Sequence, residues 1–360
     1  MRKLWSTVAI AMLSLAPLSA SAETLTDALI SAYRNSQLLE QNQAILRAAD
    51  EDLAQAVGSL RPVLSWEASI DARGAYYPAE VPGGFGGGGF VATIPRGQTD
   101  YTTASTLGLV ASLTLWDFGR GELSIDLRDA LVRASQHSLI NVEQGVLLDA
   151  VSAYVNFALQ EQLVAAQEAN VRLITQDLRA ANDRFEVGEV TRTDVALAEA
   201  QLASARSALA AAEGDYNIAR EGYRASIGNY PGRLSGLPKM PVTATSLPAA
   251  RTIAMRTHPA ILRAQEQAKA QNIAIEIARA NMLPSVSGSA RLTQTFTGDG
   301  GGAVFSGGST GPIAESLSIG LSQTIYQGGQ LSSQLRKSID GSQLFHAILL
   351  QTGFVVGTAV

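Results

Sequence analysis

The stretch Leu64–Arg73 reads LSWEASIDAR, and apolar and polar residues alternate along it. Its even positions, such as Trp66 and Ile70, are apolar, and its odd positions are polar. A period of two is typical of a β-strand that has one apolar face. The sequence therefore predicts a strand here, about ten residues long, which is the length of a transmembrane β-strand.

Three further segments alternate in the same way, so that the chain has four predicted strands in two hairpins, at 62–117 and 284–327. Their apolar positions are Leu107, Leu109, Ala111, Leu113 and Leu115, then Val286, Ala290 and Leu292, and finally Leu317, Ile319, Leu321 and Ile325. A soluble antiparallel sheet with one wet face has the same pattern. Alternation alone therefore leaves a membrane sheet and a soluble sheet both open.

Loops and aromatic residues favour the membrane interpretation. Glycine-rich tracts at 83–89 and 298–311 separate the strands of each hairpin. Long loops on one side and aromatic residues at both strand ends are typical of outer-membrane barrels. We expect Trp66 and Trp116 to meet at the periplasmic end of their hairpin. The full set of expected membrane-interface aromatics is Trp66, Trp116, Tyr76, Tyr77, Tyr101 and Tyr326.

The hairpins belong to an internal duplication. A shift of 222 residues aligns Leu60–Ser65 with Met282–Ser287, and a shift of 210 aligns Leu115–Gly119 with Ile325–Gly329. Repeats of this kind indicate that one structural unit occurs twice. We expect a first repeat at 23–227, with a helix, the hairpin 62–117 and a long helical hairpin at 119–227. A proline-rich linker at 228–248 and an incomplete second repeat at 249–360 follow, with a helix, the hairpin 284–327 and a partial helix.

Long helices flank the hairpins. The segment 25–57 contains neither proline nor glycine and is rich in strong helix formers, so we expect one opening helix there. No proline occurs between Gly119 and Arg184, and the following segment from Thr193 to Ile227 repeats small and apolar residues in a heptad. This spacing predicts a coiled-coil seam.

The turn between the two long helices, Arg184–Val195, reads RFEVGEVTRTDV. Gly188 can end the first helix in a left-handed conformation, and Thr191 or Thr193 can cap the second. Asp194 lies near the start of that helix, where a negative charge is favourable. An ordinary connection between helices has the same signals, so the spacing alone assigns no function to the turn.

The turn nevertheless resembles the periplasmic tip of the TolC-like outer-membrane efflux and type I secretion channels. The stretch Trp116–Arg120 resembles the strand-to-helix junction of this family, and Leu60–Pro62 resembles its helix-to-strand junction. The resemblance implies a homotrimer in which each chain gives four strands to one twelve-stranded barrel, above a periplasmic tunnel of coiled-coil helical hairpins. It also implies that the tip binds a periplasmic adaptor, which is bound to an inner-membrane transporter. The implied docking residues are Val187, Gly188, Val190, Thr191 and Asp194.

Elementary chemistry agrees with an oligomer, because a sheet of four strands has two open edges and no open edge can face lipid. The second repeat departs from the family pattern. It stops at Val360, whereas the first repeat continues for about 75 residues past the corresponding point. We therefore expect that these residues are C-terminally truncated relative to the family and lack a second helical hairpin.

The first residues, 1–22, are expected to be a signal peptide, since Arg2 and Lys3 precede an apolar run and a small-residue cleavage pattern. A retained N-terminal anchor is the alternative. Such a signal would direct export from the cytoplasm, and the family resemblance implies the outer membrane of a Gram-negative bacterium, with the helices in the periplasm.

Catalytic chemistry is not indicated by the sequence. The chain has no cysteine, its three histidines lie far apart, and its net charge of −5 offers no basic surface for a nucleic acid. We therefore predict no catalytic residue, no metal site and no cofactor. A soluble periplasmic coiled-coil adaptor or structural protein is the alternative function, and a secreted enzyme is a third.

Overall fold

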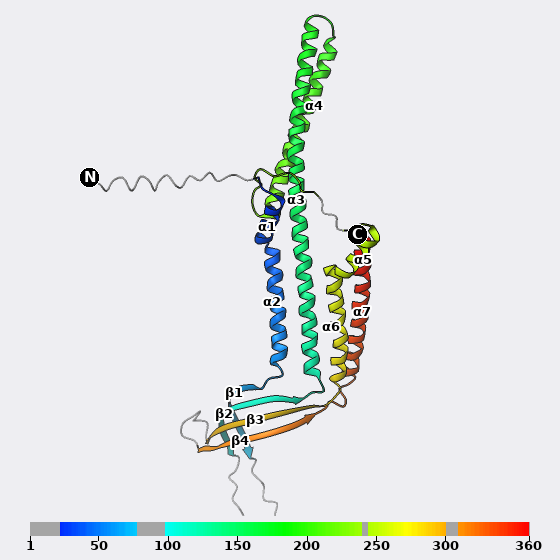
Figure 1. Ribbon diagram of the computed structural model, residues 1–360. Coiled ribbons are helices and arrows are strands. Elements are labelled where there is room, and N and C mark those ends of the chain that lie inside the picture. The colour runs from blue at the N-terminus through cyan, green and yellow to red at the C-terminus, as the bar shows by residue number, and fades with distance from the viewer. Residues whose placement is uncertain (1–21, 78–97, 240–243, 300–308, 360) are drawn as a thin grey trace, which may run out of the picture. The chain divides into compact units, whose positions relative to one another are not determined.

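The computed structural model describes residues 22–77, 98–239, 244–299 and 309–359 (Figure 1). It divides into two units: one contains 1–46 and 136–260, and the other contains 47–135 and 261–359. The expected signal peptide and most of both glycine-rich tracts lie outside the described residues. No described helix is both long enough and apolar enough to span a bilayer.

The second unit contains a single antiparallel sheet of four strands in the order β1-β2-β3-β4. The strands are β1 (Val63–Tyr77), β2 (Gln98–Trp116), β3 (Ser285–Asp299) and β4 (Ser309–Ser322). The predicted α+β fold with four strands is confirmed, but the strands have 14 to 19 residues rather than about ten. Their outer ends are polar and glycine-rich, and the antiparallel ladder continues past the point where the alternation of the sequence fades.

The register gives the sheet one apolar and one polar face. Trp66 lies opposite Leu109, which in turn lies opposite Leu292, so apolar side chains share a face across three strands. The expected meeting of Trp66 and Trp116 is wrong, because Trp116 pairs with Val286 on β3 instead. Trp116 lies seven positions along β2 from Leu109, the partner of Trp66, which is a distance of roughly 23 Å. Trp116 packs against Phe118, with ring centroids 5.9 Å apart.

Helices precede and follow the strands at matching places in the two repeats. The helices are α1 (Leu25–Asn35), α2 (Gln37–Gly58), α3 (Arg120–Glu186), α4 (Arg192–Ile227), α5 (Leu247–Thr257), α6 (Pro259–Ala280) and α7 (Gln330–Ala359). The offset that carries Leu25 to Leu247 also carries the bounds of α2 and β1 to those of α6 and β3. The second offset carries the start of α3 to the start of α7. The element bounds thus repeat with the same two shifts as the sequence motifs.

The expected single opening helix is wrong, because it is broken at Ser36 into α1 and α2. Ser36 has an extended backbone, and its hydroxyl accepts a hydrogen bond from the amide of Leu39 at 3.4 Å. The serine therefore starts a new helix without a proline. The corresponding break in the second repeat lies at His258, before Pro259.

The first unit is held by a helical seam between α3 and α4. The predicted heptad is confirmed along α4, since five of its six buried residues fall on it: Leu202, Ala205, Ala212, Ala219 and Tyr223. The sixth, Ile227, lies one position past the heptad at the end of the helix. Near the end of α4, fully buried Tyr154 of α3 and Tyr223 pack in one cluster with Ala28 and Ala32 of α1. Small residues on α1 let the aromatic rings approach closely, which builds a dense core in this unit.

Glu23 ties this cluster to the linker. The Tyr154 hydroxyl donates to the carbonyl oxygens of Glu23 (3.2 Å) and Ser235 (2.8 Å). The Tyr223 hydroxyl donates to the Glu23 carboxylate at 2.8 Å, and the amide of Gly232 donates to its other oxygen at 3.1 Å. Burial and the adjacent carboxylate raise the pKa of Tyr223 well above its usual value. The chain before α1 and the chain after α4 are therefore fastened at one point.

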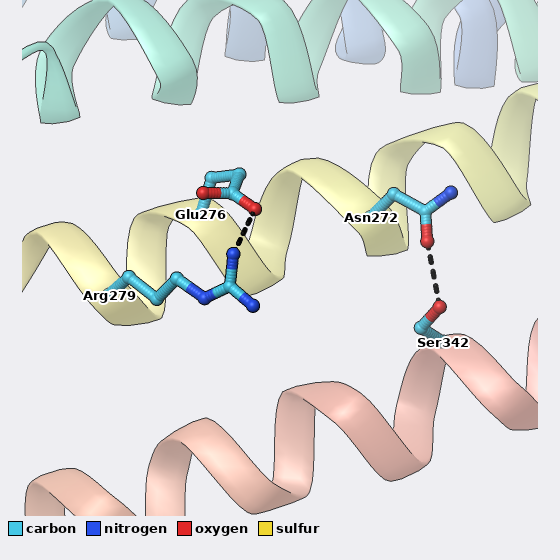
Figure 2. A network of polar contacts seen from close by, with 4 residues as sticks. All are labelled: Asn272, Glu276, Arg279 and Ser342. Carbon is cyan, nitrogen blue, oxygen red and sulfur yellow. Dashed lines mark hydrogen bonds and ion pairs between the residues drawn. The ribbon is translucent and has the colours of Figure 1, made fainter.

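In the second unit, α6 and α7 lie side by side (Figure 2). The hydroxyl of Ser342 on α7 donates to the amide oxygen of Asn272 on α6 at 2.7 Å. One turn further along α6, Glu276 and Arg279 form an ion pair at 2.7 Å on the helix surface. The Asn272–Ser342 bond is thus the polar contact that bridges the two helices in this view.

Candidate docking turn and membrane face

The turn that was singled out in the sequence connects α3 to α4 (Figure 1). Gly188 has a positive φ of 80°. Its amide donates to the carbonyl of Phe185 at 3.0 Å, and the amide of Glu189 donates to the carbonyl of Arg184 at 2.9 Å. These two bonds around a left-handed glycine form a Schellman motif, which satisfies the last carbonyls of α3.

Thr191 and Asp194 fix the start of α4. The hydroxyl and the backbone amide of Thr191 both donate to the Asp194 carboxylate, at 2.7 and 2.8 Å. These hydrogen bonds hold the pKa of the Asp194 carboxyl below its usual value, the hydroxyl contributing most. Thr191 is therefore the N-cap, and Thr193 lies inside the helix. The turn is rigid on both sides because each helix end is capped.

The rigid turn exposes apolar side chains to solvent. Val187 is 72% exposed and Phe185 is 43% exposed, whereas Val190 is half-buried. Charged residues of both signs surround them, including Glu186, Glu189 and Arg192. An exposed apolar residue on a capped, preorganised turn is suited to contact with another protein, since little conformational entropy is lost on binding. The structure brings Gly188, Thr191 and Asp194 into one capped motif, with Val187 at its surface.

The aromatic residues expected at the membrane interfaces are distributed over the sheet. Trp66, Tyr76 and Trp116 are 60% or more exposed on their strands. Tyr326 lies beyond the end of β4 and is 85% exposed, and its place at a membrane interface stays a prediction. The side chains of Tyr77 and Tyr101 lie outside the described residues.

Two charged features of the sheet were missed by sequence reasoning. Arg291 and Glu67 approach to 3.9 Å on the polar face, across Gly108 of the intervening strand β2. Glu315 lies on the apolar face, since it pairs with Leu292 and alternates with Ile313 and Leu317 along β4. The alternation of β4 contained the signal for Glu315, as a single acidic residue at an apolar position.

The described residues contain no group of three or more histidine or acidic side chains that is placed to hold a metal ion. The sheet and the helical hairpin offer surfaces rather than a convergent polar site. Together they define a class of protein in which a sheet with one apolar face joins long α-helical hairpins.

Comparison with known proteins agrees with this class. Residues 28–229 match the model of the outer membrane efflux protein family. The chain belongs to this family, and it is accordingly a protein of the outer membrane of a Gram-negative bacterium. It is 31% identical over 329 residues to the outer membrane efflux protein BepC of Brucella suis biovar 1 (strain 1330). This match covers 89% of the chain and 64% of BepC, so the chain spans less than two thirds of its relative.

Solved structures share the fold. The structure matches CusC with a TM-score of 0.72 at 18% identity, over 93% of this chain and 73% of that one. It matches the CmeC outer membrane channel of Campylobacter jejuni with a TM-score of 0.71 at 18% identity, over 92% of this chain and 68% of that one. The fold predicted from the resemblance is therefore confirmed, with an open four-stranded sheet in the single chain. These proteins are described as efflux proteins and channels, and none of them is described as an enzyme.

Proposed function

We propose that the chain is a subunit of an outer-membrane channel in a tripartite efflux or type I secretion system, and that it is a passive conduit rather than an enzyme. Its cargo would be drugs, other small molecules or polypeptides. The observation that carries the proposal is a sheet with one apolar face and, among the described residues, two unpaired edges, in a chain of the outer membrane efflux protein family. The helices of the chain extend into the periplasm in this proposal.

The dimensions of the strands fit a membrane. The shortest strand has 14 residues. At ~3.3 Å per residue and a tilt of ~40°, it rises roughly 35 Å, which exceeds the ~25 Å apolar band of an outer-membrane barrel. Because four strands are fewer than the eight of the smallest bacterial barrels, several copies must join, and three copies give the twelve strands that the family resemblance implies.

The faces of the sheet fit the same arrangement. The apolar face, which contains Trp66, Leu109 and Leu292, would contact lipid. The polar face, which contains the Glu67–Arg291 pair, would line the aqueous lumen. A soluble periplasmic adaptor needs no such sheet, and membership of the outer membrane efflux protein family argues against this alternative.

The turn between α3 and α4 is the proposed docking site for a periplasmic adaptor, with Val187, Gly188, Val190, Thr191 and Asp194 as its residues. The exposed Val187 supports the proposal, because its apolar side chain is displayed on a turn that is capped on both sides. The inner-membrane transporter would be reached through the adaptor and not by direct contact.

Fractionation tests the channel itself. The full chain should be recovered in outer membranes, require detergent for extraction and run as a multimer in mild detergent. Recovery in the soluble periplasm would contradict the proposal.

The docking turn is tested with Val187→Asp in cells that lack their own efflux channel, with ethidium accumulation as the readout. Efflux should fall at least several-fold, because a charge replaces the exposed apolar contact. Leu173→Asp is the matched control, since Leu173 is 57% exposed on α3 away from the turn. Equal efflux in both variants, at equal amounts of outer-membrane protein, would remove the turn from the proposal.

A further inference from the structure

Two cavities lie at corresponding places in the two repeats, where a strand of the sheet leads into a helix. The first has a volume of about 260 Å³ and is lined by Leu60 and by residues of the segment 114–122. The second, of about 390 Å³, is lined by Met282 and by residues of the segment 323–332. The two offsets of the duplication carry Leu60 to Met282 and 114–122 to 324–332. The cavity is therefore a feature of the repeated unit.

A β-bulge turns Trp116 towards the apolar face of the sheet. β2 pairs with β3 up to Thr114, and the next pair joins Trp116 to Val286, so that Leu115 is the extra residue. A bulge of this kind re-aims the side chains beside it. Val286 alternates in phase with Leu292 on the apolar face, and Trp116 shares this face because residues directly opposite each other do so. The first cavity therefore lies at the end of the surface that would contact lipid.

The rims of both cavities are amphipathic. Leu115 and Trp116 are exposed at the first cavity, and their counterparts Ile325 and Tyr326 are exposed at the second. Trp and Tyr are enriched where a membrane meets water, since one part of each side chain is apolar and another part is polar. If the helices extend into the periplasm, both cavities lie at the level of the headgroups of the periplasmic leaflet.

The two cavities differ in charge. Asp117 and Glu122 line the first, and their counterparts in the second are the neutral Gln327 and Ser332. Asp117 is held in place, because its Oδ2 accepts a hydrogen bond from the Gly121 amide at 2.8 Å. No lysine or arginine is among the described residues that line the first cavity. Two carboxylates beside an indole ring favour a cation, and a cavity smaller than the ~300–1,000 Å³ of drug-sized sites suits a small one.

We propose that the first cavity binds the headgroup of a phospholipid that ends in a primary ammonium group, as in phosphatidylethanolamine. The three N–H donors of the ammonium group match the carboxylates of Asp117 and Glu122, and its charge lies over the ring of Trp116. The acyl chains follow the apolar face from Leu115 towards Leu109. This inference rests on the proposed placement of the sheet in the outer membrane, and it adds a lipid preference that the first repeat has and the second lacks.

Other occupants fit this cavity less well. An anionic headgroup, such as that of phosphatidylglycerol, is repelled by the two carboxylates. The trimethylammonium group of phosphatidylcholine keeps the positive charge but has no N–H to donate to them. A free amine in the periplasm lacks the acyl chains that cover the exposed Leu115 and the apolar face beyond it. The continuity of the cavity with the apolar face therefore selects a lipid, and the carboxylates select its headgroup.

Fluorescence quenching by brominated lipids tests the site. Of the three tryptophans, Trp5 lies in the expected signal peptide, so Trp66→Phe leaves Trp116 as the sole tryptophan of the processed chain. This chain is reconstituted in phosphatidylcholine vesicles that contain brominated phosphatidylethanolamine, phosphatidylglycerol or phosphatidylcholine at equal mole fraction. We expect the ethanolamine lipid to be enriched at least ~3-fold around Trp116 relative to the choline lipid, and the glycerol lipid to be depleted.

Glu122→Gln and Asp117→Asn should each remove most of this enrichment, because a charge is lost, and the asparagine oxygen can still accept from the Gly121 amide. The matched control is Glu161→Gln, which removes an exposed charge far along α3 and should leave the enrichment unchanged. Equal quenching by the three lipids, or enrichment that persists in both cavity variants, would overturn the headgroup site and leave the proposed channel standing. Absence of quenching by any lipid would instead place Trp116 outside the membrane and overturn the proposed function.

The second cavity is a control within the same chain. Tyr326→Trp, combined with Trp66→Phe and Trp116→Phe, reports the lipid at that cavity and should show no preference for the ethanolamine lipid. Adding Gln327→Asp and Ser332→Glu should create the preference there. A preference at the second cavity without the added carboxylates would overturn the assignment of the headgroup to them. Displacement of the lipid from the first cavity by an excess of free O-phosphoethanolamine would overturn the lipid as its occupant.

Discussion

In the first repeat, α2 and α3 are joined by an ion pair between Asp52 and Arg128, whose charged atoms lie 3.2 Å apart. In the second repeat, α6 and α7 are joined instead by the hydrogen bond from Ser342 to Asn272. The residue that corresponds to Asp52 is Ala274, so the polar contact has moved while the helices have kept their bounds. The two repeats therefore share the bounds of their helices but not the individual polar contacts between them. This is expected if burial of small apolar residues determines the packing.

The largest expected effect lies in the aromatic cluster of α3. This helix buries Tyr154 and Phe157, which lie past the stretch Arg120–Asp149 that corresponds to α7. We predict that Tyr154→Ala lowers the free energy of unfolding by about 3–5 kcal/mol, because it removes a fully buried ring. Urea unfolding in detergent, followed by far-UV circular dichroism, measures this.

Two companion variants make the comparison specific. Tyr154→Phe keeps the ring but leaves the carbonyls of Glu23 and Ser235 without their donor, which should cost about 1–3 kcal/mol. Val356→Ala in α7 should cost less than Tyr154→Ala because fewer buried atoms are lost. If Val356→Ala proved as damaging as Tyr154→Ala, the aromatic cluster would not be the larger contributor to stability.

Backbone conformation at the entry to α3 and α7 gives the next effect. Gly328 and Phe118 occupy corresponding positions, and both have φ of 57°. Gly328→Ala should cost about 1–2 kcal/mol in the free energy of unfolding, because a left-handed conformation strains any residue with a Cβ atom, although the space around Gly328 is open. The urea midpoint is the measurement.

Phe118→Gly should instead be nearly neutral. It relieves the same strain but removes the edge-to-face contact with Trp116, which is worth about 0.5–1.5 kcal/mol. Gly222→Ala is the control, since Gly222 is exposed inside α4 and alanine there should stabilise the helix by about 0.5–1 kcal/mol. If Gly328→Ala left the free energy of unfolding unchanged, the backbone at position 328 would be able to leave the left-handed conformation without cost.

The two polar links between helices should respond differently to salt. Asp52→Asn should cost less than about 1 kcal/mol and lose its effect at high salt, because both partners of the ion pair are largely exposed. Ser342→Ala should cost about 0.5–1.5 kcal/mol at every salt concentration, because it removes a neutral, buried hydroxyl and leaves the amide oxygen of Asn272 without its donor. Urea midpoints at 0.05 M and about 1 M NaCl compare them. Equal salt dependence of the two variants would contradict the distinction between an exposed ion pair and a buried neutral hydrogen bond.

The sequence was sufficient to predict the elements in which apolar residues recur with a regular period. The alternation from Leu64 and the heptad of α4 give the correct faces, because burial on one side is what imposes each pattern. It was not sufficient at Ser36, where a serine cap breaks a helix that composition alone favours. It also missed the partner of Trp116, since the register between β2 and β3 depends on a contact between distant segments, and a bulge shifts it after Thr114.

The candidate docking turn shows the same limit. Gly188 and the pair Thr191 and Asp194 could be read as caps because helix ends have local chemical requirements. The exposure of Val187 could not be predicted from the sequence, because it depends on which side of the turn faces the helical seam. Glu315 was overlooked for a related reason, since its place on the apolar face is certain only once β4 is paired.

The smallest effect concerns the two matched helix caps, at α1 and α4. Thr24 and Asp27 repeat the arrangement of Thr191 and Asp194, and hydrogen bonds from each threonine lower the pKa of its aspartate. A carboxyl whose pKa is lowered on folding stabilises the fold above its ordinary pKa of 3.8, and this contribution is lost as the pH falls through the lowered value. Asp194→Asn should therefore lower the melting temperature slightly at pH 7, and this difference should shrink as the pH falls below 3.8. Asp177→Asn, which removes an exposed charge from α3, should lack this pH dependence.

Asp27→Asn should show the same pH dependence as Asp194→Asn. It should also change the near-ultraviolet circular dichroism of Tyr154 and Tyr223, because α1 packs in the aromatic cluster. If Asp27→Asn and Asp194→Asn differed in the sign of their pH dependence, the two caps would not be equivalent, and the rigidity argued for the docking turn would need another source.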